Sequence, residues 1–194
     1  MKETEKELIL DHEIIGEQVI IRSALPDDAE YTYNLRQNTE KTKYVHTLSG
    51  GVSQQKKWLQ SQIDSEDSYF LLVSDKNRNP LGTYGIYAID KQNMTARLGR
   101  TLLNGNPIQN LETVYMIHEY AFYQMGVKAL YTEVFEDNIA AVGGNRQMGG
   151  EVISQSYNEE FGYNNLLFEI TKENYEKKRV KLKKLVERFG KRQN

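Results

Sequence analysis

The sequence has no cysteine, which removes several classes of chemistry. Without thiols there is no disulfide framework, no thiolate metal site and no cysteine nucleophile. Histidine is scarce as well, with three copies at His12, His46 and His118. Their wide spacing argues against a zinc site. We therefore expect a protein that works without a bound metal.

Long apolar runs are also missing. No stretch approaches the length that spans a bilayer, and the first residues, MKETEKELIL, are charged where a signal peptide would be apolar. These features predict a cytoplasmic protein with no membrane partner. A chain of 194 residues can bury a core without disulfides or metals, and its length suggests one domain, with or without an appendage.

The small net charge of −2 hides an uneven distribution. Residues 172–194 hold ten Lys and Arg against three Glu. A basic tail of this kind can meet nucleic acid, but it is more often the solvated face of a helix. We expect the latter, with residues 1–171 as the main domain and 172–194 as a basic amphipathic helix. Such a helix packs on the body of the protein or on a second copy, so a homodimer is one possible assembly.

Hydrophobic patterns and turn residues predict the element order. Expected strands cover 18–23, 69–74, 81–89, 97–103, 130–135, 152–156 and 166–171. Expected helices cover 26–38, 53–63, the stretch after Pro107 as far as Met125, 138–148 and 173–189, with Ser53 as a cap of the second. We expect a short helical turn before the first strand. The order predicts a single α/β (α+β) domain with a mixed, mostly antiparallel sheet of about seven strands flanked by helices.

The stretch from Thr95 to Met125 combines a strand, the polar turn Asn104–Pro107 and a long amphipathic helix. Outward-pointing N–H groups and the helix dipole favour an anion at such a helix start, and a phosphate-bearing ligand suits it. An ordinary strand-to-helix connection that binds no ligand would have the same sequence pattern.

Three segments resemble the GNAT superfamily of acyl-CoA-dependent N-acyltransferases over about residues 18–171. PLGTYGIYAID resembles the hairpin before the family's cofactor strand, and EYAFYQMGVKALYTEVFEDN its progression of helix, glycine, strand and asparagine. Asn138, Ala141 and Gly149 then fall at the family's Asn-x-x-Ala and closing glycine positions. NLRQNTEKTKYVHT, SQQKKWL and NPIQNLETVYMIHEYAF are most similar to enzymes that acylate nucleotide-linked amino sugars, with the ribosomal-protein N-terminal acetyltransferases as neighbours.

The resemblance implies acetyl-CoA as cosubstrate and assigns it a set of contacts. The backbone of the cofactor strand would bind the pantetheine arm, the turn and helix start would bind the pyrophosphate, and the next helix would complete the site. The implied cofactor residues are Leu102, Leu103, Asn106, Ile108, Gln109, Asn110, Asn138, Ala141 and Asn145. Two departures stand out: 106–110 has no glycine, and Asn145 replaces the tyrosine that protonates the leaving thiolate in many members.

Direct attack of an amine on a thioester needs a deprotonated amine and a stabilised thiolate. The catalytic candidates are His46 in the loop between the first two helices, Glu112 in the first turn of the central helix, and Tyr84. Each has an ordinary alternative: an exposed loop histidine, a carboxylate that complements a helix dipole, and a strand tyrosine. For the acceptor, the candidate contacts are Arg36, Asn38, Tyr44 and Tyr87, since a diphosphate-linked sugar suits arginine and aromatic groups.

The resemblance therefore implies an acetyl-CoA-dependent N-acetyltransferase for a small amine, with a nucleotide-linked amino sugar as the expected acceptor. Two alternatives remain. The basic tail favours a ribosomal-type N-terminal protein acetyltransferase, whereas the missing glycines and tyrosine favour a GNAT-fold binding protein without transferase activity.

Overall fold

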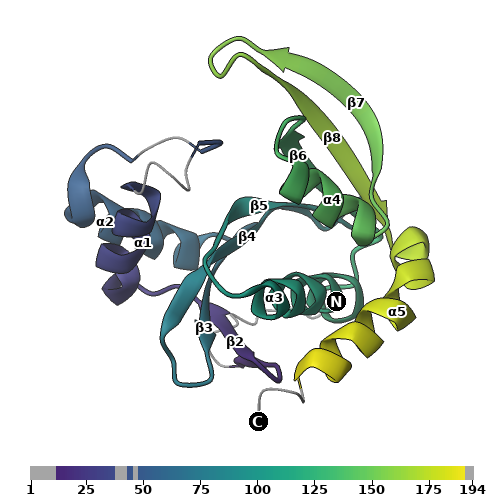
Figure 1. Cartoon of the computed structure of the whole chain (residues 1–194). Helices are drawn as coiled ribbons and strands as arrows, with labels where there is room; N and C mark the ends of the chain where they lie inside the picture. Colours follow the sequence, from purple (N-terminus) through teal and green to yellow (C-terminus); the bar gives the residue numbers. More distant parts are fainter. Residues whose placement is uncertain (1–11, 38–42, 46–47, 191–194) are drawn as a thin grey trace.

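The computed structural model describes residues 12–37, 43–45 and 48–190, with side chains given as far as Arg188. One eight-stranded sheet organises them, in the order β1-β2-β3-β4-β5-β6-β8-β7 (Figure 1). The strands are β1 (Ile14–Ile15), β2 (Val19–Ser23), β3 (Tyr69–Asp75), β4 (Pro80–Asp90), β5 (Thr95–Leu103), β6 (Ala129–Phe135), β7 (Glu151–Asn158) and β8 (Tyr163–Thr171). The helices are a 3-10 turn η1 (Pro26–Asp28), α1 (Ala29–Gln37), α2 (Gly51–Asp64), α3 (Pro107–Glu119), a π-helical turn η2 (Tyr120–Gln124), α4 (Ile139–Gln147) and α5 (Lys172–Gly190).

The predicted mixed sheet is confirmed. Every neighbouring pair of strands is antiparallel except β5 and β6, which run parallel. The parallel pair requires a crossover, and α3 with η2 supplies it. The eighth strand is β1, where Ile14 and Ile15 pair with Ile21 and Ile20 in place of the expected helical turn.

Helices cover both faces of the sheet (Figure 1). Alternate residues of a strand point to opposite faces, so β3 serves two cores. Its Leu71 packs in the large cluster with α3 and α5, and its Phe70 packs with Leu59 of α2. At the far end of the sheet, Val142 of α4 packs on β6 and β8. The protein is thus a three-layer sandwich, with α1 and α2 on one face and α3, α4 and α5 on the other.

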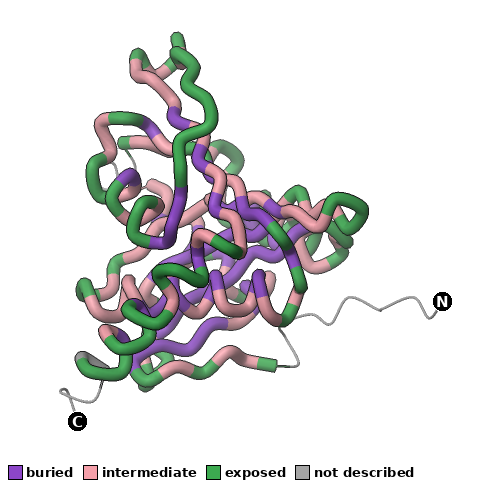
Figure 2. The backbone as a smooth tube through the Cα atoms, turned by 90° about the vertical axis from the view of Figure 1, so that its right-hand side faces the viewer, coloured by how far each residue is buried: buried purple, intermediate pink, exposed green. Residues whose placement is uncertain are grey.

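The C-terminal helix α5 is part of the main core. Its apolar residues Tyr175, Leu182 and Val186 are buried against the α3 side. Glu119 of α3 accepts hydrogen bonds from Tyr175 Oη at 2.8 Å and from Arg179 Nε and Nη2, both at 2.7 Å. The predicted basic helix therefore turns its charged side outward and docks through an apolar stripe. By contrast, the β7–β8 hairpin extends from the body, and its outer strand is exposed along nearly its whole length (Figure 2).

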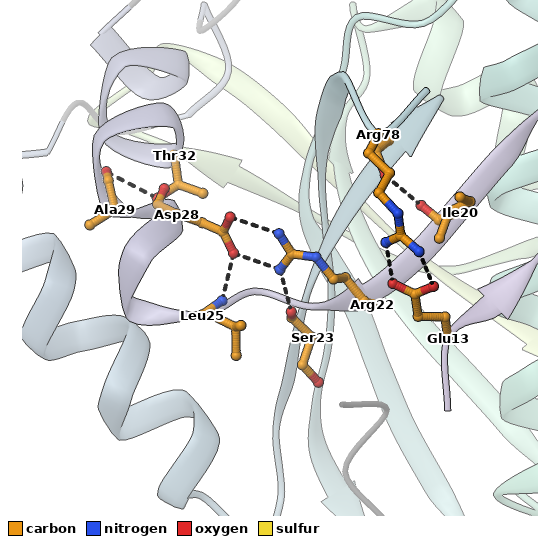
Figure 3. A network of polar contacts seen from close by, with 10 residues as sticks. Glu13, Ile20, Arg22, Ser23, Leu25, Asp28, Ala29, Thr32 and Arg78 are labelled. Atoms are coloured by element: carbon orange, nitrogen blue, oxygen red, sulfur yellow. Dashed lines mark hydrogen bonds and ion pairs between the residues drawn. The ribbon is translucent and has the colours of Figure 1, made fainter. Parts of the chain in front are cut away.

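An ion pair fixes the start of α1 against the sheet (Figure 3). Arg22 of β2 donates to both carboxylate oxygens of Asp28, at 2.7 and 2.8 Å. Asp28 also accepts the backbone N–H of Leu25 at 2.7 Å. The paired carboxylate raises the pKa of the Arg22 guanidinium. This network holds α1 in place on the face that it shares with α2.

Two helix boundaries differ from expectation. The second helix begins at Gly51, and its N-cap is Gly50 at a φ of 91°, not Ser53. Only glycine adopts that backbone conformation readily, so the backbone turn sets the start of the helix. The central helix is regular only as far as Glu119, and the expected last turn continues as the π-helical η2, closed by a hydrogen bond from Met125 N to Tyr120 O of 3.0 Å.

Candidate active site

A cavity of about 440 Å³ opens where β5 and β6 separate. The two strands pair only from Thr95–Leu98 with Ala129–Thr132, and no ladder joins them beyond that point. On its other side β5 carries a β-bulge, since Gly85 pairs with Gly99 but Thr83 pairs with Leu102. Arg100, which has a φ of 53°, lies in this bulge. A bulge bends its strand, so this one turns β5 away from β6 and leaves a backbone edge free for a ligand.

The cavity passes between the two strands and reaches both faces of the sheet. Tyr84 and Met148 belong to the core on the α3 side, whereas Tyr44 packs on Phe135 from the connection between α1 and α2. Residues of β5, α3, β6, α4 and the β7–β8 hairpin complete the wall. The described lining residues are Tyr44, Val45, Tyr84, Gly99, Arg100, Thr101, Leu102, Val114, His118, Thr132, Glu133, Val134, Phe135, Asn138, Ala140, Ala141, Gly144, Asn145, Met148, Asn158, Phe161 and Asn165.

The start of α3 differs from an open anion site. Asn106 caps the helix, and its Oδ1 accepts the N–H groups of Ile108 at 2.9 Å and Gln109 at 3.0 Å. Gln109 returns the bond by accepting Asn106 N at 2.9 Å, and the N–H of Asn110 goes to the Asn106 carbonyl at 3.0 Å. Pro107 has no N–H. The backbone donors from Asn106 to Asn110 are therefore satisfied within the helix start, and none of these residues is among the described cavity lining.

On the α4 side, several of the residues expected to contact the cofactor lie at the cavity. Asn138 caps α4 by accepting Ala141 N at 3.2 Å, and Asn145 donates its Nδ2 to the Ala141 carbonyl at 2.9 Å. All three residues line the cavity, as does Leu102, while Leu103 lies outside its described lining. Added Cβ atoms at Gly143 and Gly144 would meet nothing within 4 Å, so this part of α4 leaves room for a ligand.

Glu112 has a structural role. Its carboxylate accepts the backbone N–H groups of Glu17 at 2.7 Å, Gln18 at 2.7 Å and Val19 at 3.1 Å, and the residue is only 1% exposed. It lies outside the described cavity lining. Both carboxylate oxygens are thus occupied by backbone amides, away from the cavity. This geometry corrects the expectation of Glu112 as a base, because the residue anchors the start of β2 to α3.

Tyr84 lines the cavity, and burial raises the pKa of its phenol far above the ordinary value, against a smaller lowering effect of Thr101. The phenol is therefore protonated throughout the neutral range, so Tyr84 can donate a proton or hydrogen bond but cannot act as a base. His46, the other catalytic candidate, lies outside the described residues, as does Asn38 among the acceptor candidates.

Tyr44 and its neighbour Lys43 cross to the far side of the cavity. Asp137, which follows β6, accepts Lys43 Nζ at 2.9 Å and Tyr44 Oη at 3.0 Å. Lys43 Nζ also lies 4.9 Å from the centre of the Tyr163 ring. These contacts place Tyr44 in the cavity wall. The remaining acceptor candidates, Arg36 and Tyr87, lie on the α1–α2 side, outside the described lining.

Two of the lining residues that the sequence reasoning missed as site residues carry potential proton acceptors. Glu133 is the one carboxylate among the described lining residues, and it forms an ion pair with Arg97 of β5. Its position depends on the parallel register of β5 and β6, which no local pattern reveals. A weak signal existed in the sequence, since Glu133 is the one charged residue of this mostly apolar strand.

His118 is the second. It is 2% exposed, and its Nδ1 lies 2.8 Å from the Val114 carbonyl, which can only accept. The ring is therefore the Nδ1–H tautomer, and the unprotonated Nε2 has no partner among the described residues. Burial lowers the pKa of His118 to about 4, although the bond to Val114 raises it. His118 therefore presents a neutral imidazole to the cavity.

None of the helices within the described residues is both long and apolar enough to cross a membrane. A search of curated proteins finds no relative. Among solved structures, apo FdhC, described as a nucleotide-linked sugar GNAT, aligns with a TM-score of 0.77 at 18% identity over 90% of this chain and 98% of that one. Spermidine N-acetyltransferase from Vibrio cholerae in complex with CoA and spermine aligns with a TM-score of 0.75 at 15% identity, over 82% and 99% of the two chains. At these identities the likeness concerns the fold.

A comparison of the sequence with family models identifies the family. A model described as the acetyltransferase (GNAT) domain matches residues 18–184, from β2 into α5. The match spans most of the chain and includes every lining element of the cavity. The chain therefore belongs to the GNAT family of acetyltransferases and is an acyltransferase.

Proposed function

We propose that the protein transfers the acetyl group of acetyl-CoA directly to the amine of a nucleotide-linked amino sugar. The observation that carries this proposal is the cavity between β5 and β6, which opens to both faces of the sheet. A thioester can enter from the α3–α4 side and an amine from the α1–α2 side, so that the two meet between the strands. The described relative FdhC supports the acceptor class by its own description as a nucleotide-linked sugar GNAT.

The cavity fits the pantetheine arm of the donor. Residues 99–103 of β5 have no strand partner on the β6 side, so backbone groups along that edge can bind the amides of the arm. Apolar side chains such as Leu102 and Val134 and the small residues of α4 give the slot its width. The pyrophosphate fits less well, because the amides at the start of α3 are already bound to Asn106.

The reaction needs two proton transfers. The amine nitrogen attacks the thioester carbonyl, the C–S bond breaks, the nitrogen loses a proton and the CoA thiolate gains one. We assign the first proton to the carboxylate of Glu133, which lines the cavity and pairs with Arg97, and the second to the buried phenol of Tyr84. Asn145 cannot perform the second step, because a carboxamide has no transferable proton near neutral pH.

Release of the CoA thiol tests the function. Incubation of the protein with acetyl-CoA and a UDP-linked amino sugar should produce thiol and acetylated sugar in equal amounts. Glu133→Gln and Tyr84→Phe should each lower kcat by about 10²-fold or more, with unchanged acetyl-CoA affinity. Faster acetylation of a peptide that starts with serine or alanine would overturn the acceptor assignment.

The alternative of a GNAT-fold binding protein without transferase activity is not favoured, because the family match makes the chain an acyltransferase. The self-capped start of α3 bears instead on how tightly the CoA pyrophosphate binds.

A further inference from the structure

Arg100 occupies a specialised place at the cavity. It is the bulged residue of β5, and its φ of 53° is a conformation that residues other than glycine seldom adopt. The side chain lies on the face of the sheet covered by α1 and α2, since it contacts Trp58 and Gln62 of α2. Backbone strain of this kind persists where the surrounding structure requires it, often beside a ligand.

Neighbouring groups hold the guanidinium in a fixed plane. Its centre lies 4.4 Å from the centre of the Tyr87 ring and 5.6 Å from that of Trp58. Nη1 donates to Gln62 Oε1 at 2.8 Å and to Ser68 Oγ at 3.1 Å. These partners are neutral. They orient the charge, and among the described residues no hydrogen bond engages Nε or Nη2.

Within the described residues no carboxylate forms an ion pair with Arg100. Burial lowers the pKa of its guanidinium, and Tyr87 and then Asp67 act against that lowering. Within the described residues, Arg22, Arg78, Arg97 and Arg179 each form an ion pair with an acid, and Arg100 forms none. The group is half-buried, and its charge is close enough to contribute to the lowered pKa of Arg36, after burial. An arginine that is taken partly out of water without an ion-pair partner is costly unless an anion binds there.

The position of Arg100 separates it from the anionic groups of the donor. The starts of α3 and α4, where CoA phosphates would meet helix dipoles, lie with the layer on the other face of the sheet. The amine, by contrast, must arrive on the face of α1 and α2. Lys43, which is paired with Asp137, and Tyr44 border the same approach.

We propose that Arg100, presented by the β5 bulge and held by Tyr87, Gln62 and Ser68, binds a phosphate group of the acceptor and thereby selects phosphate-bearing amines over polyamines. This inference rests on the proposed acetyl transfer and names the feature of the acceptor that the site recognises. Its open N–H groups suit phosphate oxygens, which arginine binds by two parallel hydrogen bonds. A polyamine such as spermidine would bring more positive charge to a cation that has no ion-pair partner.

Isothermal titration of UDP into protein already saturated with CoA tests the proposal, because saturation removes the donor site as a competitor. The wild type should bind UDP, while uridine, which lacks the phosphates, should bind at least tenfold more weakly. Arg100→Met should weaken UDP binding about 10- to 100-fold, the loss expected for charge-assisted hydrogen bonds. Arg100→Lys should recover only part of the affinity, because an ammonium lacks the planar fork.

Arg78→Met is the matched control. Arg78 also has a positive φ, of 65°, and it lies in the β3–β4 turn, paired with Glu13. The variant loses the same charge at the same kind of backbone position and should bind UDP as the wild type does. Melting temperatures without ligand show whether each variant is folded.

Three results would overturn the inference. They are equal UDP binding by wild type and Arg100→Met, an equal loss in Arg78→Met, and competition between spermidine and UDP at similar concentrations. Titration with acetyl-CoA separates this failure from failure of the proposed function. Acetyl-CoA binding and turnover with no dependence on Arg100 would refute the phosphate site alone, whereas no acetyl-CoA binding by the wild type would refute the transferase proposal.

Discussion

Replacement of Glu112 by glutamine should destabilise the fold and leave the chemistry intact. The carboxylate joins α3 to the start of β2 through three backbone amides, with N···O distances of 2.7, 2.7 and 3.1 Å. Glutamine has the same shape but replaces one acceptor oxygen by an NH₂ donor. At least one buried amide must then lose its acceptor, and the remaining bonds lose the assistance of the negative charge.

The size of the effect follows from these contacts. An unsatisfied buried donor costs about 1–3 kcal/mol, and a hydrogen bond to a charged group is worth roughly 1 kcal/mol more than a neutral one. The free energy of unfolding should therefore fall by about 2–4 kcal/mol. For a chain of this size each kcal/mol lowers the melting temperature by about 2–4 °C, so the expected loss is roughly 4–16 °C.

Urea denaturation and thermal melting would measure the change, with Glu66→Gln as the control because Glu66 is exposed. The Glu112 variant should unfold at lower urea with an unchanged m-value, while kcat per folded molecule stays within about twofold of the wild type. Loss of a general base lowers the rate by about 10²–10⁴-fold. Unchanged stability with a rate loss of that size would refute the structural role and restore Glu112 as a catalytic residue.

Three further predictions follow from individual contacts. Neutral, buried His118 has its pKa lowered to about 4 from the ordinary 6.5, so its contribution to stability is complete above pH 6.5 and is lost as the pH falls towards 4. In denaturation experiments the free energy of unfolding should fall by about 3 kcal/mol over this pH range, and by less in His118→Gln. The same pH dependence of stability in both proteins would contradict the prediction. Arg179→Met should cost about 1–2 kcal/mol, because Glu119 loses its bidentate partner, and a melting temperature within 1–2 °C of the wild type would count against this anchor of α5. Asn106→Gly should cost only a few tenths of a kcal/mol and tighten CoA binding, since it frees two amides at the start of α3; weaker binding in calorimetry would show that the asparagine itself contacts CoA.

Much of the fold was accessible from local patterns. The turn at 75–80 is a clear case, since Asp75 accepts the N–H groups of Asn77 and Asn79, as the polar run between two apolar strands predicts. The strand β1 escaped because two residues carry no periodicity. Its pairing with β2 arises from a tight turn in which Gly16 N bonds to Val19 O.

The site was harder to predict, because its geometry depends on contacts between distant segments. No local sequence pattern near Arg100 predicts a bulge. The bulge is evident only from the pairing register of β4 and β5. The role of Glu112 depends on amides 93 to 95 residues away. The closed start of α3 was within reach, however, since asparagine followed by proline and then by glutamine at the third position is a capping-box pattern.

The central claim is that the cavity between β5 and β6 binds acetyl-CoA, and two adjacent glycines of α4 offer the most direct test. Gly144 lines the cavity and Gly143 is exposed, yet neither would clash with an added Cβ. Gly144→Phe and Gly143→Phe therefore change the helix backbone in the same way, but only the first fills the slot.

Calorimetric titration with acetyl-CoA is the measurement. We expect the wild type and Gly143→Phe to bind with similar affinity and Gly144→Phe to bind at least tenfold more weakly. Equal affinity for the two variants would contradict the account, because it would show that the cofactor binds away from the gap between β5 and β6.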